Sequence, residues 1–220
     1  MTTNRLAIFD LDGTLLDTIG DLAEACNHML ALRGLGSHTR EEYAQMVGNG
    51  ILNLVKRALP EELRTPEYAE AARQDFLAYY TANIDRYTVP YEGIREVLHT
   101  LQAEGWTMAV ASNKFDEGTQ KLVATIFPEV EFKAIYGNRE GCPLKPDKAL
   151  LDLIIAECSA TTETTVMIGD SGVDMQTAIN AGIDAVGVAW GCRTREELES
   201  FAPLAVVDRC EEILQIIANF

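Results

Sequence analysis

One stretch decides the fold of this chain: Arg5-Leu6-Ala7-Ile8-Phe9-Asp10-Leu11-Asp12-Gly13-Thr14. Its apolar run predicts a buried strand, and the Gly-Thr pair predicts a turn where that strand ends. Side chains alternate along a strand, so Asp10 and Asp12 leave on the same side and meet beyond its carboxyl end, where open α/β sheets bind ligands. Two carboxylates this close repel each other and need a cation or a shared proton. A strand that merely ends in an Asp-Gly turn would explain only one of these acids.

Between this loop and residue 86, the sequence predicts helices and no strand. Apolar residues recur at helical spacing over 21–33, 51–59 and 66–84. Thr39, with Glu42 three residues later, matches a capping box that opens a helix. The stretch Val47-Gly48-Asn49-Gly50 separates this helix from the next one.

After Tyr87 the pattern changes to short apolar strands that alternate with helices, which predicts βαβ units and a parallel sheet covered on both faces. The expected strands are 107–111, 132–136, 165–168, 185–188 and 205–207. We therefore expect a doubly wound, Rossmann-like α/β core domain built from residues 1–15 and 88–220, with an all-helical cap domain, residues 16–87, inserted into it. Because the insert follows the loop of Asp10 and Asp12, we expect it to cover the ligand-binding edge as a lid.

The composition argues against several classes of function. The chain has 220 residues and a formal net charge of −16, so it lacks the basic surface that binds nucleic acids or anionic membranes. The N-terminus carries no signal-peptide pattern, and no run approaches ~18 apolar residues. The five cysteines are odd in number and form no CxxC pair, which favours reduced thiols in a cytoplasmic protein. We expect no nucleic acid and no membrane as partner, and the oligomeric state stays open.

Polar residues stand at the predicted ends of several strands. They are Ser112 and Asn113 after the second strand, Lys145 before a helix, and Asp170 and Asp174 after a later strand. In a parallel sheet all of them meet the two acids of the opening loop at one edge. Several acids without His or Cys favour Mg²⁺ over zinc.

These residue types suit phosphoryl transfer. A carboxylate can attack phosphorus and form an aspartyl-phosphate, and an acid two residues on can donate a proton to the leaving group and later take one from water. The hydroxyl of Ser112 and the backbone N–H groups of Ser112 and Asn113 can bind phosphoryl oxygens, and Lys145 can neutralise the charge that spreads over them. For each residue taken alone, the alternatives are a solvated loop lysine and a serine that ends a strand or caps a helix.

Together, these residues resemble the four ordered motifs of the haloacid-dehalogenase-like (HAD) hydrolase superfamily over the whole chain. The motifs are Asp10-Leu11-Asp12-Gly13-Thr14, the strand-end Ser112, Lys145-Pro146 and Gly169-Asp170-Ser171-Gly172-Val173-Asp174. The resemblance implies that Asp10 is the nucleophile and Asp12 the general acid/base. It implies Mg²⁺ bound by the Asp10 carboxylate, the Asp12 carbonyl and the Asp170 carboxylate. Asp174 would support the metal or hold Lys145, and the inserted helices would be the cap of one subclass.

Two features narrow the function within this superfamily. The acid at Asp12 disfavours members that cleave carbon–halogen or carbon–phosphorus bonds, and it favours hydrolysis of phosphate esters. Residues 47–50, the run Lys56-Arg57-Ala58-Leu59 and residues 190–198 are similar to segments of phosphoglycolate phosphatases. We therefore expect a Mg²⁺-dependent phosphatase of a small organic phosphate monoester, with a small phosphorylated metabolite as its partner and phosphoglycolate as the leading candidate. The alternatives are a phosphosugar mutase of the same superfamily and a non-catalytic protein that binds a phosphorylated metabolite.

Two points in the insert stay open. Gly48 and Gly50 either break a helix or contact the substrate. Arg57 is either a surface residue or, like Lys56, a partner for a carboxylate of the substrate.

Overall fold

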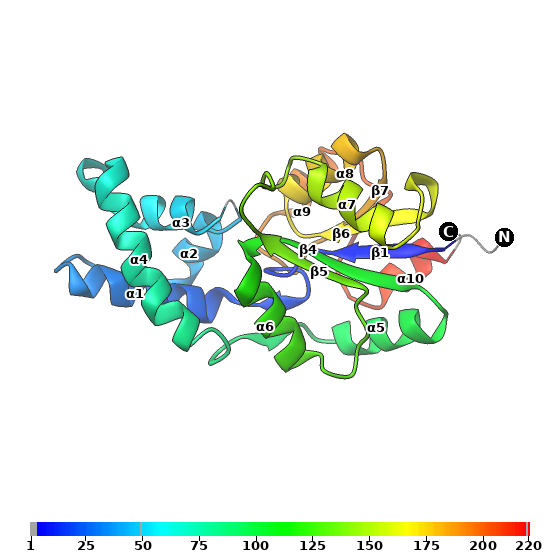
Figure 1. Ribbon diagram of the computed structural model, residues 1–220, viewed down its shortest axis with the longest axis horizontal. Helices are drawn as coiled ribbons and strands as arrows, with labels where there is room; N and C mark the ends of the chain where they lie inside the picture. Colours follow the sequence, from blue (N-terminus) through cyan, green and yellow to red (C-terminus); the bar gives the residue numbers. More distant parts are fainter. Residues whose placement is uncertain (1–3, 49, 219) are drawn as a thin grey trace.

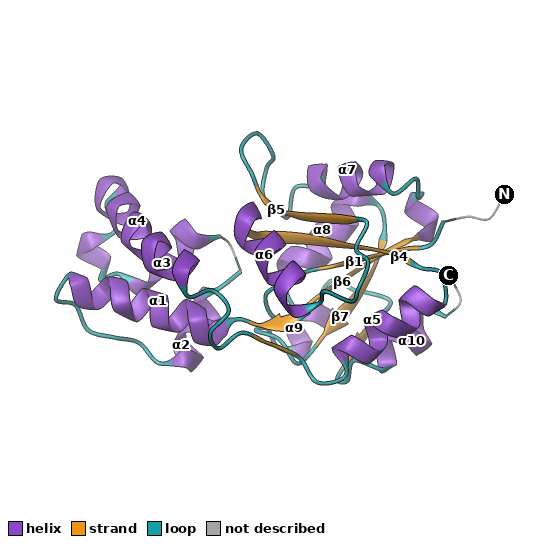
Figure 2. Ribbon diagram, turned by 60° about the horizontal axis from the view of Figure 1, so that its bottom comes forward, coloured by secondary structure: helices purple, strands orange, loops and turns teal. Residues whose placement is uncertain are grey.

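A parallel sheet of six strands forms the centre of the protein. The structure is a computed structural model, and it describes residues 4–48, 50–218 and 220. The strands lie in the order β5-β4-β1-β6-β7-β8, with helices on both faces of the sheet (Figure 1, Figure 2). Their bounds are β1 Leu6–Phe9, β4 Thr107–Phe115, β5 Ala134–Asn138, β6 Thr165–Gly169, β7 Asp184–Val188 and β8 Ala205–Val207. The expected doubly wound α/β fold is confirmed.

The two faces of β1 belong to two different apolar layers. Ala7 and Phe9 pack with helices α5, α6 and α10, whereas Leu6 and Ile8 pack with α7, α8 and α9. These helices are α5 Ile94–Ala103, α6 Asp116–Ile126, α7 Ala149–Glu157, α8 Gly172–Ala181, α9 Arg195–Glu199 and α10 Glu212–Ile217. Because both faces are buried, the strand is a continuous apolar run rather than an alternating one.

The register of β1 places Asp10 at the carboxyl edge of the sheet, in its middle. β1 pairs in parallel with β4 and with β6, and Phe9 lies opposite Val110 on one side and Ile168 on the other. The next backbone N–H, that of Asp10, donates to the carbonyl of Ile168 at 2.9 Å. The side chain of Asp10 is therefore presented by a backbone that neighbouring strands hold on both sides.

Two expectations about strands are wrong. β4 does not end at Ala111 but continues to Phe115, and its register with β5 shifts between these residues. Residues 112–114 are polar, and this composition suggested that the strand had ended before them. They remain in the strand because buried polar side chains need partners, and distant segments supply these partners. The segment 15–86 also contains a strand, since β2 (Leu16–Asp17) pairs antiparallel with β3 (Val89–Pro90). Strands of two residues are too short to form a periodic pattern.

Four α-helices and a 3₁₀-helix separate β2 from β3 and lie together beside one end of the sheet (Figure 1). They are α1 Ile19–Leu32, α2 Arg40–Met46, α3 Ile51–Ala58, η1 Glu61–Leu63 and α4 Pro66–Ala82. We refer to residues 16–87 as the insert. The predicted capping box opens α2, with Glu42 N donating to Thr39 Oγ1 at 3.3 Å. Asn49, in the predicted break after α2, lies outside the described residues. None of the described helices is both long and apolar enough to cross a membrane.

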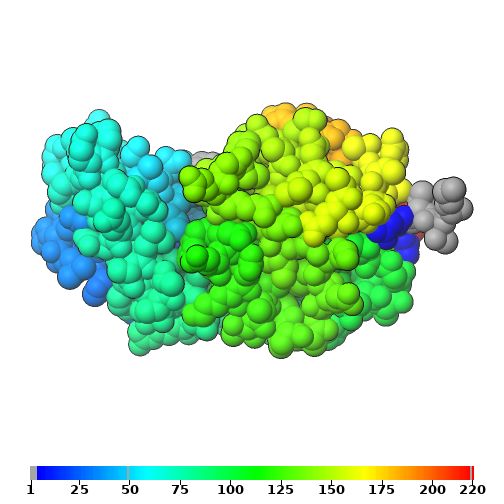
Figure 3. Space-filling model, viewed as in Figure 1, coloured from blue at the N-terminus to red at the C-terminus, as the bar shows by residue number. Residues whose placement is uncertain are grey.

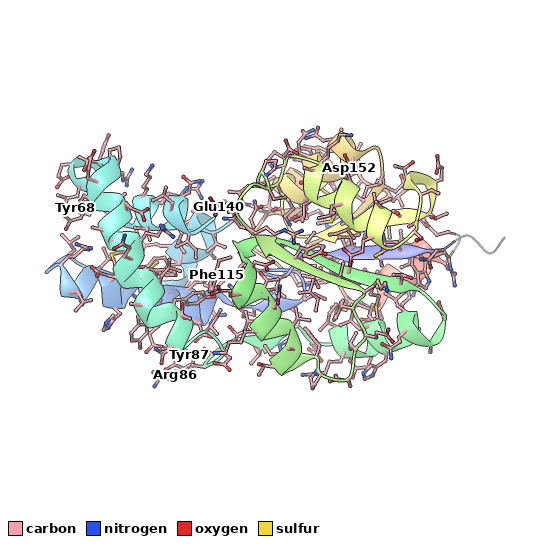
Figure 4. All side chains as sticks on the ribbon, viewed as in Figure 1. Tyr68, Arg86, Tyr87, Phe115, Glu140 and Asp152 are labelled. Carbon is pink, nitrogen blue, oxygen red and sulfur yellow. The ribbon has the colours of Figure 1, made fainter. Side chains whose placement is uncertain are left out.

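Asp21 links the start of the insert to the segment that leads back to the core. Its buried carboxylate accepts hydrogen bonds of 2.7 to 3.0 Å from the backbone N–H groups of Tyr87 and Thr88 and from the hydroxyl of Thr88. Figure 4 shows Tyr87 near the end of α4, where the chain turns back towards the core. One carboxylate therefore satisfies three donors on the returning segment.

We expect Asp21→Ala to lower the free energy of unfolding by about 3 kcal/mol, because it leaves these donors without their charged acceptor. Urea unfolding followed by circular dichroism measures the change. Asp85→Asn is the control, because Asp85 forms an exposed pair with Lys121 at 3.8 Å and its loss should change stability by less than about 0.5 kcal/mol. Equal stability of Asp21→Ala and the wild type would contradict the role of Asp21.

Candidate active site

One pocket collects every site residue that the sequence predicted. Asp10, Asp12, Ser112, Asn113, Lys145, Asp170 and Asp174 all line it. It spans about 640 Å³, including space open to solvent. The insert contributes Leu22, Val47, Gly48, Gly50, Ile51 and Leu54 to its walls. Figure 3 shows the insert, coloured blue to cyan, in contact with the green part of the core.

Asp170 is enclosed by two glycine-containing loops. Gly13 has a φ of +92°, and a Cβ there would lie 2.3 Å from Asp170 Oδ2. A Cβ at Gly191 would lie 2.3 Å from the Cβ of Asp170, so both loops need glycine to come this close. The carboxylate also accepts a hydrogen bond from the backbone N–H of Cys192 at 2.7 Å. Segments after β1 and β7 therefore fix a side chain that follows β6.

Lys145 lies among the charged residues and is almost completely buried. Its Nζ donates to Asp10 Oδ1 at 2.9 Å, to Asp174 Oδ1 at 2.6 Å and to the carbonyl of Ala111 at 2.8 Å. The side-chain amide of Asn113 holds the lysine through two hydrogen bonds with its backbone, at 2.9 and 3.0 Å. Burial by itself lowers the pKa of Lys145, but the carboxylates of Asp10 and Asp174 outweigh it and raise this pKa. The ammonium therefore stays charged.

Asp10, Asp170 and Asp174 form a cluster of buried carboxylates, and one oxygen from each lies within 4.8 Å of the others. Burial and the neighbouring acids raise the pKa of Asp10 to about 8, although Lys145 opposes them. Burial and Asp174 likewise raise the pKa of Asp170 to about 7. A hard cation such as Mg²⁺ suits these oxygen donors and would keep them ionised. Of the two roles left open for Asp174, contact with Lys145 is present in the structure.

Asp12 has a different charge environment from Asp10. Its carboxylate pairs with Lys114, whose Nζ lies 3.0 Å from Oδ1 and 3.3 Å from Oδ2. The same ammonium donates to the hydroxyl of Tyr80 at 2.5 Å. The sequence did not single out Lys114 or Tyr80, because a lysine beside a strand end and a tyrosine on a helix have ordinary surface and core explanations. The place of Lys114 directly after the predicted Ser-Asn pair was a weak signal.

Arg193 is a further pocket residue, from the segment 190–198, that the sequence did not predict as part of the site. Its guanidinium donates to the carbonyls of Val47 at 2.6 Å and Ala44 at 3.1 Å. Its Nε lies 3.9 Å from a carboxylate oxygen of Glu197. Arg193 follows Cys192, the residue that holds Asp170, so the loop that fixes a candidate metal ligand also contacts the insert.

Of the insert residues whose role the sequence left open, some line the pocket and others do not. Gly48 and Gly50 line the pocket, with φ values of +120° and +79°. Lys56 and Arg57 are not among the described residues that line it. The guanidinium of Arg57 instead donates to the carbonyl of Met46 within the insert. Arg193 from the core, by contrast, lines the pocket and contacts the insert.

The chain is similar to proteins of one family. A family model described as haloacid dehalogenase-like hydrolase matches residues 7–188. A phosphoglycolate phosphatase of Mesorhizobium japonicum is 32% identical over 216 residues, covering 97% of this chain and 95% of the relative. One from Agrobacterium fabrum is 34% identical over 207 residues, covering 92% and 88%. The crystal structure of a predicted phosphoglycolate phosphatase from Haemophilus somnus matches with a TM-score of 0.89 at 26% identity, covering 98% of this chain and 99% of that one. The chain therefore belongs to the haloacid dehalogenase-like hydrolase family.

Proposed function

We propose that this phosphoric monoester hydrolase acts on small organic phosphates through an aspartyl-phosphate on Asp10, with Mg²⁺ as cofactor. One observation carries the proposal, namely that the two acids of the opening loop have different partners. Asp10 lies with Lys145 and the carboxylate cluster, whereas Asp12 lies with Lys114. A cation bound to the cluster would keep Asp10 ionised for the attack on phosphorus, and Asp12, which lies outside the cluster, would move the proton.

Mg²⁺ would be held by the carboxylates of Asp10 and Asp170 and by the backbone carbonyl of Asp12, with Asp174 close by. The three clustered carboxylates supply only oxygen donors, and the raised pKa values of Asp10 and Asp170 show how strongly burial disfavours their charged forms. A bound Mg²⁺ would offset this negative charge and polarise an oxygen of the phosphoryl group.

The first step transfers the phosphoryl group to the protein. A carboxylate oxygen of Asp10 attacks phosphorus, the bond from phosphorus to the ester oxygen breaks, and Asp12 gives a proton to the departing oxygen. Lys145 and the hydroxyl of Ser112 hold the phosphoryl oxygens, over which negative charge spreads. The Ser112 hydroxyl accepts a hydrogen bond from the backbone N–H of Lys114 at 3.2 Å, so its own proton can be directed to the substrate.

The second step releases phosphate. A water molecule attacks phosphorus and passes a proton to Asp12, which lost one in the first step. The bond between phosphorus and the Asp10 oxygen then breaks, and both acids return to their starting forms. Asp12 therefore acts as the acid in the first step and as the base in the second.

In this proposal residues 16–87 form the cap domain, and residues 1–15 with 88–220 form the core domain. The proposal is supported by the apolar insert residues Leu22, Ile51 and Leu54, which line the pocket together with the charged edge of the sheet. Phosphoglycolate is the leading substrate, because two relatives described as phosphoglycolate phosphatases are 32% and 34% identical to this chain.

We expect Asp10→Asn to lower kcat by at least about 1000-fold, because the neutral amide cannot form the phosphoenzyme. Phosphate release under saturating substrate measures the loss. Asp152→Asn, at a carboxylate on α7 labelled in Figure 4 and paired with Lys148, is the matched control and should keep wild-type turnover. Undiminished turnover of Asp10→Asn would rule out Asp10 as the nucleophile.

A substrate panel tests the class of reaction. Phosphoglycolate, sugar phosphates, nucleotides and pyrophosphate are each incubated with Mg²⁺, with EDTA, and with EDTA followed by excess Mg²⁺. We expect phosphoglycolate to have the highest kcat/KM, EDTA to abolish phosphate release, and Mg²⁺ to restore it. An isomeric phosphosugar without free phosphate would indicate a mutase. Calorimetric binding without hydrolysis of any compound would indicate a non-catalytic protein.

The affinity for Mg²⁺ should rise between pH 6 and pH 8. Without the cation, the pKa of Asp10 is about 8 and that of Asp170 about 7. Both carboxyls are then mostly protonated at pH 6 and must release protons when the cation binds. We expect the Kd from calorimetric titration to be at least about tenfold lower at pH 8 than at pH 6. The same dependence in Asp152→Asn serves as the control, and a Kd that is constant over this range would contradict the proposed ligands.

A further inference from the structure

The ammonium of Lys114 joins three segments that are distant in the sequence. Lys114 belongs to β4, Asp12 to the loop after β1 and Tyr80 to helix α4 of the insert. Its Nζ lies 3.0 Å from Asp12 Oδ1 and 2.5 Å from the Tyr80 hydroxyl. The Lys114 side chain is only 2% exposed, against 16% for Asp12. The charge partner of the candidate acid/base is therefore shared with the insert.

A buried ammonium needs acceptors for the protons that it cannot give to water. Lys114 has two kinds of acceptor here, the carboxylate of Asp12 and the hydroxyl of Tyr80. The carboxylate comes from a loop, whereas the hydroxyl comes from a long helix. The contact with Tyr80 therefore sets the direction in which the ammonium meets Asp12, and removing it leaves a buried donor without its partner.

Tyr80 is held firmly enough to act as such an anchor. Its side chain is fully buried, and its ring packs against Phe76 at a centroid distance of 5.1 Å and against Phe115 at 6.1 Å. Phe115 is the last residue of β4 and lies where the core meets the insert (Figure 4). These two ring contacts restrict the Tyr80 ring, so its hydroxyl is presented at a fixed point.

We propose that Tyr80 is a positioning residue for Asp12 and that it acts through Lys114. The hydroxyl of Tyr80 holds Nζ of Lys114, and the ammonium holds the Asp12 carboxylate where it can reach the leaving oxygen. The insert thus takes part in proton transfer in addition to lining the pocket. This inference rests on the proposed role of Asp12 as the general acid/base.

Tyr80→Phe tests the inference, because it removes the hydroxyl and keeps the ring. We expect kcat and kcat/KM for phosphoglycolate to fall about tenfold with KM unchanged, a part of the effect that general acid/base catalysis supplies. With p-nitrophenyl phosphate, whose leaving group departs without protonation, kcat/KM should stay near the wild-type value. Equal losses on both substrates, or no loss on either, would overturn the inference.

Tyr79→Phe is the matched control, because it removes a hydroxyl from the neighbouring residue of the same helix. The Tyr79 hydroxyl donates to Glu24 at 3.1 Å and not to a pocket residue, so both substrates should be turned over as by the wild type. Asp12→Asn, measured in parallel, shows whether the proposed function itself holds. If Asp12→Asn lacks the dependence on the leaving group, the role of Asp12 fails; if it shows that dependence and Tyr80→Phe does not, the positioning role of Tyr80 fails.

A double-mutant cycle keeps the test decisive if Tyr80→Phe is poorly folded. Lys114→Gln should show the same selective loss with phosphoglycolate, because it breaks the same link from the other side. Adding Tyr80→Phe to Lys114→Gln should then cause no further loss of kcat/KM. Losses that multiply in the double mutant would show that Tyr80 acts independently of Lys114 and would overturn the inference.

Discussion

The structure depends on one constraint, which is that several charges are buried together at the carboxyl edge of the sheet. Asp10, Asp170 and Asp174 bring oxygen atoms within 4.8 Å of one another, and Lys145 bonds to two of the three carboxylates. A buried polar network is favourable only when every member is satisfied, because a buried charge without a partner is strongly destabilising. This requirement explains why backbone groups and close-fitting glycines surround the site.

The insert and the core share both an apolar interior and polar contacts. One apolar cluster runs from Phe9 in the sheet to Phe76 in α4 without interruption. Arg193 reaches from the core to carbonyls of the insert, and Lys114 reaches from the core to Tyr80. The pocket is lined by residues from both parts, so its walls and the acids at the edge of the sheet are held in one packed arrangement.

The sequence predicted the alternation of strands and helices along the chain, and it named the seven candidate site residues that the pocket brings together, because each of these depends on a local pattern. An apolar run followed by acids, or a Lys-Pro pair ahead of a helix, can be recognised without knowing what lies nearby. The prediction failed where a long-range partner changed the outcome. Residues 112–114 were expected to follow the end of a strand, because they are polar, yet they continue β4. The buried ammonium of Lys114, for example, finds its partners in Asp12 and Tyr80. Arg193 lies in the segment 190–198 that the sequence pattern noted, but its contacts with the distant insert could not be predicted from that pattern.

The sequence by itself determined the doubly wound α/β class, the helical insert and the identity of the acids at the sheet edge. Apolar periodicity and the residues that follow each strand are local properties, so they can be recognised along the chain. Only the tertiary structure decided which acid meets which lysine. Asp10 pairs with Lys145 and Asp12 with Lys114, across 135 and 102 residues of sequence. That choice follows from packing, because the register of the strands and the placement of the insert set the distances over which charges interact.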